Sequence, residues 1–259
     1  MRPHFFLSLS HYYFFQHLFS WKVGLRITPV MKRNGGREAP DGVRYPHIAL
    51  DVLGQCHSSA CVELGNTRVI CAVHHPQQLV DEYRGSRGRV ACTVRRSASA
   101  GSHAAGSAQP SVVTPEKDMS LALEGVAEEV VILEKIPQLL VEVVVEILAE
   151  DGGVWDAVAT SMSAALVSGG FEMYDLFSAC GSALLSDGAV VLDPDAAEES
   201  NAQASALVCV MLNSGDICYA RHQGSCEPGT VLELVSSAMK GCLSRKSAIT
   251  TQLINHPIL

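Results

Sequence analysis

The sequence lacks the paired cysteine motifs of many metal-binding and redox proteins, the short repeats of solenoid proteins, and an excess of positive charge. Its nine cysteines include no C-x-x-C pair, and we find no short internal repeat. Only 6% of the 259 residues are aromatic and 18% are charged, while 47% are hydrophobic, as in ordinary globular domains. The net charge of −8 argues against a protein that coats nucleic acid through bulk positive charge, although a local basic patch stays compatible with it.

The cysteines are scattered singly, most of them in apolar stretches, as at Cys71, Cys92, Cys209 and Cys218. Thiols in such surroundings behave as small core residues. We therefore expect reduced cysteines in an intracellular protein, with no disulfide and no bound metal.

Residues 1–30 contain no acidic residue and are rich in aromatic ones. They are too interrupted to span a bilayer and lack the pattern of a signal peptide. An amphipathic targeting segment is one interpretation. We prefer an N-terminal extension that is disordered, or not translated if synthesis begins at Met31, followed by a single domain over residues 31–259.

Residues 139–166 organise the rest of the chain. Positions 139–148 are apolar on both faces of a strand, which predicts a strand buried between layers. Gly152 and Gly153 allow a tight reversal, and Asp156 is expected to cap or start the helix that follows.

The remaining pattern predicts an α+β fold with helices packed on mixed β-sheets. Gly65-Asn66 is expected to close one hairpin, and residues 98–111 are expected to form a flexible loop. We expect strands at 47–53, 59–64, 68–74, 89–95, 177–185, 189–192, 206–212 and 217–221, and helices at 116–133 and 231–244, the last with Val231, Val235, Met239 and Cys242 on one face.

Several segments together resemble the ribonuclease PH family. They are Arg33 to Arg37 with Arg44, a strand–Gly65-Asn66-Thr67–strand unit closed by Pro76, the turn 150–153, and segments 172–176 and 191–194. The resemblance covers about residues 31–246 and implies a ribonuclease PH-like fold. Within the family the sequence looks most like ring subunits of the eukaryotic RNA exosome, of the mRNA transport regulator type.

Active members of that family cleave RNA from its 3′ end with inorganic phosphate. The chemistry needs donors that hold phosphate and a carboxylate or metal near the bond. Here Val154 and Trp155 stand where a phosphate-gripping Thr-Arg pair is usual. Ser200 and Ala206 align with catalytic aspartates, and Gly125 aligns with an arginine. Gln223-Gly224-Ser225 keeps something like the family's phosphate loop.

The resemblance therefore implies a catalytically silent ring subunit with no catalytic residue, which supports assembly and RNA threading in 3′–5′ RNA processing and degradation, including rRNA processing. The alternative is an active phosphate-dependent 3′–5′ exoribonuclease, with Glu198 or Glu199 as acid and Arg95 or Arg96 as phosphate clamp. The implied partners are other ribonuclease PH-like ring subunits, cap subunits and single-stranded RNA, with no membrane. The implied location is the nucleus, including the nucleolus, and the cytoplasm.

Four arginines, Arg87, Arg89, Arg95 and Arg96, are the candidate RNA-binding residues. Three of them share parity on one strand, so they would share a face and could guide RNA phosphates. A solvated face or a contact with a neighbouring subunit is the competing interpretation. A second group, Arg33, Arg37 and Arg44, is as compatible with a structural role as with binding.

Two further clusters suggest simpler explanations. His74 and His75 are adjacent on a strand and point to opposite faces, so they cannot chelate one metal ion together. No cofactor or metal site is expected. The acidic residues Asp193, Asp195, Glu198 and Glu199 are expected to form a solvated loop.

Overall fold

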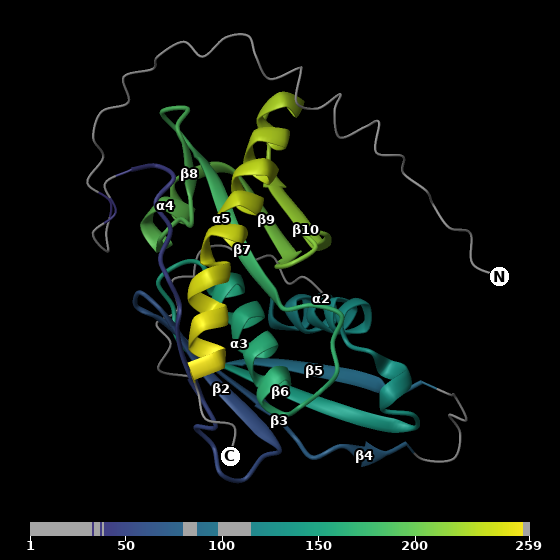
Figure 1. The fold of residues 1–259 in the computed structure, drawn as a ribbon. Helices are drawn as coiled ribbons and strands as arrows, with labels where there is room; N and C mark the ends of the chain where they lie inside the picture. Colours follow the sequence, from purple (N-terminus) through teal and green to yellow (C-terminus); the bar gives the residue numbers. More distant parts are fainter. Residues whose placement is uncertain (1–32, 34–36, 38, 80–86, 98–114, 256–259) are drawn as a thin grey trace, which may run out of the picture. The chain divides into compact units, whose positions relative to one another are not determined.

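The computed structural model describes residues 33, 37, 39–79, 87–97 and 115–255, and residues 31–259 form one compact unit. Within it the chain builds two β-sheets and several helices (Figure 1). The first sheet contains β1 (His47–Leu50), β2 (Ser58–Leu64), β3 (Thr67–Val73), β4 (Gln77–Gln78), β5 (Arg89–Arg96) and β6 (Leu139–Ala149). The second contains β7 (Phe177–Leu185), β8 (Val190–Leu192), β9 (Ala202–Met211) and β10 (Ile217–Gly224). The helices are α2 (Pro115–Val130), α3 (Val154–Ser168), α4 (Ala196–Ser200) and α5 (Pro228–Asn255).

The first sheet is mixed, as the sequence predicted. Its order is β1-β2-β3-β6-β4, all antiparallel, and β5 pairs with β6 in parallel after a crossover through α2. The predicted hairpin between β2 and β3 is confirmed, with Leu64 opposite Thr67. Its turn begins at Gly65 with φ +62°, a conformation that glycine adopts at little steric cost. The second sheet, β10-β9-β7-β8, is antiparallel throughout.

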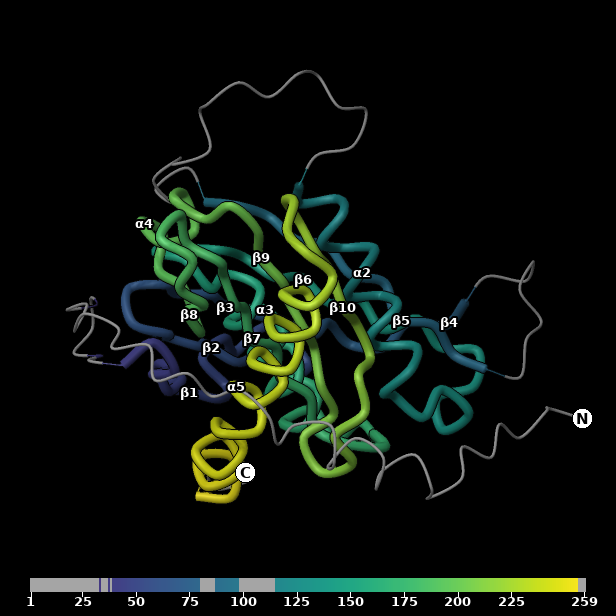
Figure 2. Tube along the Cα trace, turned by 90° about the horizontal axis from the view of Figure 1, so that it is seen from above, coloured from purple at the N-terminus to yellow at the C-terminus, as the bar shows by residue number. Residues whose placement is uncertain are grey.

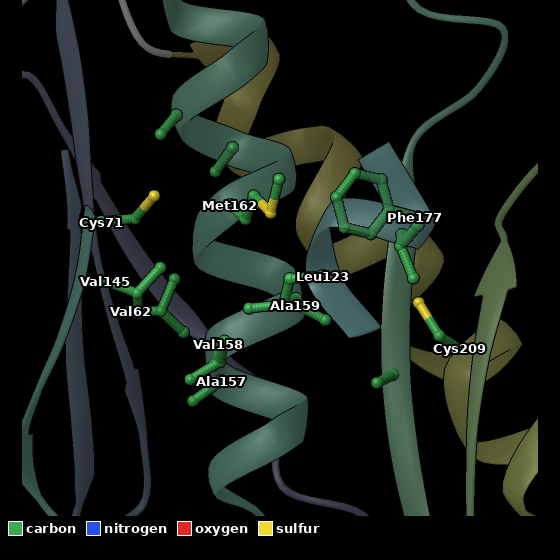
Figure 3. Packing of buried hydrophobic residues seen from close by; sticks show 14 of the residues in the cluster. Val62, Cys71, Leu123, Val145, Ala157, Val158, Ala159, Met162, Phe177 and Cys209 are labelled. Carbon is green, nitrogen blue, oxygen red and sulfur yellow. The ribbon is translucent and has the colours of Figure 1, made fainter. Parts of the chain in front are cut away.

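Helix α3 lies between the two sheets and fills the core. It packs on β2 and β3 of the first sheet and on β7 of the second. Figure 3 shows Val62 and Val145 on one side of α3 and Phe177 on the other, and all three side chains are buried. Helix α2 packs on β5 and also reaches β10, as Figure 2 shows from above, while α5 packs along β7 and β9.

The central strand β6 is confirmed, but only one of its faces is enclosed. Val141, Val143, Val145 and Ile147 are buried, as expected for the side that faces the helices. The opposite face, with Leu140, Val144 and Leu148, is only half-buried, so the prediction of a strand enclosed on both sides was wrong.

The first long helix ends three residues earlier than its periodicity predicted. Val131 leaves the helix and pairs with Met173 in an isolated antiparallel bridge, and the Ile132 amide donates to the Glu172 carbonyl. A short 3₁₀ turn, Leu133–Lys135, follows. Pairing with a distant segment has overridden a local helical pattern here.

The last helix is longer than predicted and buries a different face. Only Cys242 of the four predicted positions is buried, and Leu234, Ala238, Arg245 and Ile249 are the residues that face the core. The C-terminal turns are held to β1, because the Gln252 side chain donates to the Pro46 carbonyl and accepts from the Ile48 amide. Val235 and Met239 of the predicted face are only partly buried, and the helix continues past its predicted end at 244 to bury Arg245 and Ile249.

Two predictions, the disordered extension over residues 1–30 and the flexible loop over 98–111, concern segments outside the described residues. Across the part of the chain that is described, no helix combines the length and apolarity needed to cross a bilayer.

Candidate functional site

The two-glycine turn before α3 is confirmed and is sterically required. Gly152 and Gly153 have φ of +73° and +62°, a region that L-residues rarely adopt. A Cβ on Gly152 would lie 2.5 Å from the Asp195 carbonyl carbon, and one on Gly153 would lie 2.6 Å from Nη2 of Arg44. The turn therefore places the start of α3 in close contact with the segment after β8.

Most acidic residues of that segment are buried, so the prediction of a solvated loop was wrong for Asp193, Asp195 and Glu198, whereas Glu199 is exposed as a residue. Asp193 is 0% and Asp195 4% exposed, and the Glu198 side chain is only 14% exposed. Their carboxylates belong to a buried ion network with arginines from both ends of the domain. Its cations are Arg33, Arg37, Arg44 and Arg245, and its anions are Asp156, Asp193, Asp195 and Glu198, four charges of each sign.

The N-terminal arginines hold this segment in place. Arg44 donates to Asp193 from both Nη2, at 2.6 Å, and Nε, at 3.0 Å. Arg33 forks onto Glu198 at 2.6 and 2.8 Å and also donates to the Leu192 carbonyl. Arg37 donates to the Asp193 carbonyl. Of the two roles considered for this arginine group, the structure shows the structural one.

Arg245 closes the network from α5. Its side chain is 1% exposed, and it contacts Asp156 at 2.8 Å and Asp193 at 3.0 Å. Asp156 was expected to cap or start α3, but Gly153 occupies the N-cap position and Asp156 points into the core. Burial raises the pKa of Asp156 to about 6, even though Arg245 favours its charged form. Burial also tends to raise the pKa of Asp193, but the positive charges of Arg245 and Arg44 outweigh this effect and lower that pKa.

Helix α4 carries Glu199 to the start of α3. The helix begins with a capping box, in which Asp195 accepts from the Glu198 amide and Glu198 accepts from the Asp195 amide, both at 2.9 Å. The Gly153 amide donates to Oε1 of Glu199 at 2.9 Å. Although Glu199 as a residue is exposed, its carboxylate reaches inward, and desolvation raises its pKa to about 7.

A cavity of about 280 Å³ lies beside this contact, where the family resemblance places catalysis. Its walls include Val154, Trp155, Ala206, Gln223 and Glu199, together with the partly polar side chains of Arg96, Glu150, Asp156 and Arg221. The fold therefore brings six of the positions considered for catalysis into one cavity wall: Arg96, Val154, Trp155, Glu199, Ala206 and Gln223. Ser200 and Gly125 lie elsewhere, exposed on α4 and α2.

Trp155 offers neither the hydroxyl nor the cation of a Thr-Arg pair. Its ring stacks on Tyr219 of β10, with centroids 5.2 Å apart and an angle of 14° between the planes. The stack ties the start of α3 to the second sheet and makes one wall of the cavity apolar. Neither this pair nor the role of Arg245 was foreseen, because each depends on a partner far away in the sequence.

The four candidate RNA-binding arginines differ in their surroundings, and their RNA binding stays a prediction. Arg89 and Arg95 are exposed on the outward face of β5, and Val90, Cys92 and Val94 alternate with that face toward the core. Arg87 pairs with Glu134 at 3.1 Å on the surface. Arg96 points to the cavity side and pairs with Glu150 at 3.3 Å and Glu116 at 3.5 Å.

The thiols and histidines give no sign of a metal centre. No group of three or more His, Cys, Asp or Glu side chains in the described ranges is arranged to hold an ion. All nine cysteines are free; Cys71, Cys92 and Cys209 are buried as expected, while Cys218 is half-buried.

Comparisons with known proteins agree with this architecture. The family model described as "3′ exoribonuclease family, domain 1" matches residues 42–172. Human exosome complex component MTR3 is 32% identical over 225 residues, covering 80% of this chain and 81% of that protein. Exosome complex component Rrp41 of Methanopyrus kandleri is 29% identical over 210 residues, covering 81% and 87%.

Solved structures show the same fold. The rice Rrp46 crystal structure superposes with a TM-score of 0.72 at 21% identity, covering 85% of this chain and all of that one. The Archaeoglobus fulgidus exosome with RNA bound to the active site gives 0.70 at 19% identity, covering 83% and 92%. With a matching family model over half its length and a relative above 30% identity, this chain belongs to the 3′ exoribonuclease, or ribonuclease PH, family.

Proposed function

We propose that this chain is a non-catalytic ring subunit of an RNA exosome. Its relatives at about 30% identity are exosome components, and they match it over most of their own length. Other ribonuclease PH-like subunits, cap subunits and single-stranded RNA are its partners in this proposal. Its role is to complete the ring and to guide RNA, while associated nucleases cleave it.

The observation that carries the catalytic part of the proposal is the state of the cavity. Phosphorolysis needs a cationic or hydroxyl donor on the phosphate, and the first two residues of α3, Val154 and Trp155, supply neither. The Gly153 amide, which could hold an anion, donates to Glu199. Arg96, a cation in the cavity wall, is paired with Glu150 and Glu116.

A second function is favoured by one observation, the carboxylate of Glu199. An acid with a pKa of about 7 in a cavity is suited to proton transfer at neutral pH, so Glu199 could serve an active phosphate-dependent exoribonuclease with Arg96 as clamp. The weakness of this alternative is that both side chains are engaged with other groups of the chain.

A phosphorolysis assay separates the two functions. The full chain, alone and in a ring with its neighbouring subunits, is incubated with 3′-labelled single-stranded RNA with and without inorganic phosphate. An active ribonuclease PH serves as positive control. We expect no phosphate-dependent release of nucleoside diphosphate that depends on this chain; release that disappears in an E199Q ring would establish the enzyme instead.

The domain boundary and the location in the cell complete the proposal. Residues 31–259 act as the single working domain, after an extension that the ring does not need. The complex works in the nucleus, including the nucleolus, and in the cytoplasm. Mass spectrometry of the native N-terminus and imaging of a C-terminally tagged chain test these two points.

A further inference from the structure

The first turn of α3 is capped by a carboxylate that comes from elsewhere in the chain. Gly153 occupies the N-cap and has no side chain, so α3 has no local cap. The first amides of a helix lack partners within it and carry partial positive charge, which makes them a natural position for an anion. Here Glu199, 46 positions further along, accepts from the Gly153 amide at 2.9 Å.

The position of Glu199 is fixed by the buried ion network. Arg33 holds Glu198, the residue just before it, with two hydrogen bonds, and the capping box fixes the start of α4. The α4 backbone also lies against Gly152 so closely that a Cβ there would be 2.7 Å from the Ala196 nitrogen. Because α4 is clamped from both sides, the carboxylate of Glu199 is held at the start of α3.

A second feature of the same cavity also opposes an external anion. Asp156 lines the cavity and is 1% exposed, and its Oδ1 has no hydrogen-bond partner in the described part of the chain. With Glu150 and Glu199 in the wall as well, the cavity offers three carboxylates against the two guanidinium groups of Arg96 and Arg221. An incoming phosphate therefore meets three carboxylates, of which Asp156 is paired with Arg245 and Glu150 with Arg96.

We propose that Glu199 is a built-in substitute for phosphate: its carboxylate fills the anion position at the start of α3, keeps the glycine turn folded without a ligand, and excludes inorganic phosphate. The inference rests on the proposed non-catalytic function and explains how the loss of phosphate binding is compatible with an intact scaffold. Truncation of the Glu199 side chain to alanine should therefore open an anion site that the natural chain lacks.

The test is chemical rescue of the full-length chain. Thermal unfolding of the wild type, E199A and E199Q is followed at pH 8 in sodium phosphate and in sodium chloride of equal ionic strength. E233A, which removes an exposed glutamate of α5, is the charge-matched control. The Tm of each protein in chloride is its own reference, and only the shift that phosphate adds is compared.

Phosphate should then raise the Tm of E199A by about 2–4 °C at a roughly fivefold excess over Kd, while the other three proteins show no phosphate-specific shift. E199Q stays unresponsive because its amide still fills the site. An equal shift in the wild type, or none in E199A, would overturn the inference.

An NMR titration of the wild type covers the case in which E199A fails to fold. Inorganic phosphate should leave the Gly153 amide resonance unmoved, and a saturable shift of that resonance would overturn the inference. The two proposals fail differently: phosphorolysis by the wild type refutes the non-catalytic function, whereas a silent wild type whose Gly153 amide binds phosphate refutes only the role of Glu199.

Discussion

Replacement of Arg245 by methionine should be among the most damaging single changes in this domain. The guanidinium is 1% exposed and contacts two buried carboxylates, Asp156 at 2.8 Å and Asp193 at 3.0 Å. It also donates to the backbone carbonyls of Arg44 and Ala179, both at 2.9 Å. Methionine keeps an unbranched apolar stem but removes every one of these donors.

The loss in free energy of unfolding depends on which buried carboxylate is left without a cation. Asp193 keeps Arg44, but Asp156 keeps only the Gly181 amide at 3.4 Å. Removing one partner of a buried pair costs about 3–5 kcal/mol, which is a large share of the roughly 5–15 kcal/mol that stabilises a typical domain. For a domain of this size we expect the Tm to fall by about 6–20 °C.

The stability of R245M relative to the wild type should also depend on pH in a direction that can be predicted. Without Arg245 the folded-state pKa of Asp156 rises beyond its present value of about 6, well above that of an unfolded aspartate. A group with a raised folded pKa contributes stability below its unfolded pKa and loses it as the pH rises through the folded value. R245M should therefore recover stability, relative to the wild type, as the pH falls from 8 toward 5.

Urea unfolding of R245M is compared with that of R68M, a matched change at an exposed pair, Arg68 with Glu63 at 2.7 Å. R68M should cost less than about 1 kcal/mol. Adding D156N to R245M should restore part of the loss, because the stranded charge is gone. If R245M and R68M lose the same free energy of unfolding, or if D156N adds to the damage, the reasoning about the ion network is refuted.

Three other predictions concern Arg95 on the exposed face of β5, the glycine turn before α3, and Glu199 in the cavity wall. R95E should weaken binding of single-stranded RNA by the assembled ring and lower its salt slope by about 0.7 per lost phosphate contact, as measured by fluorescence anisotropy; an unchanged slope would mark Arg95 as structural. G153A should destabilise by about 1–3 kcal/mol because its φ is +62°, whereas G125A, on the exposed face of α2 with open space around it, should stabilise by about 0.5–1 kcal/mol; both are read from urea unfolding, and equal signs would contradict the argument. Glu199, whose pKa is raised to about 7, should contribute stability below pH 4.5 that is lost as the pH rises through 7, and E199Q should flatten this part of the pH–stability curve.

Local patterns in the sequence were enough to predict most of the elements. The β7 strand, Phe177–Leu185, and the glycine turn before α3 follow from alternation and from positive φ, which are properties of neighbouring residues. The family resemblance aligned Val154, Trp155 and Ala206 with phosphate-binding and catalytic positions, and the structure places all three in the wall of one cavity.

The error at the acidic loop and the unforeseen role of Arg245 share one physical cause, which is charge compensated from a distance. Asp193 and Glu198 look like residues of a solvated loop until Arg33 and Arg44, about 150 or more positions earlier, are placed against them. Arg245 looks like a surface residue of a helix until Asp156 is set opposite it. Periodicity treats a charged residue as polar, and the predicted helix ended at 244, just before Arg245.

The long reach of Arg245 also has a consequence for synthesis on the ribosome. Asp156 and its partner are 89 positions apart, so at 5–20 residues per second the carboxylate waits about 4–18 s before its cation has been made. The four strands of the second sheet are made during that interval, but the cation that pairs with Asp156 is not yet present. Folding of this subunit is thereby coupled to the completion of its last helix, and a chain that stops short of α5 remains a substrate for chaperones and proteases rather than a component available for assembly.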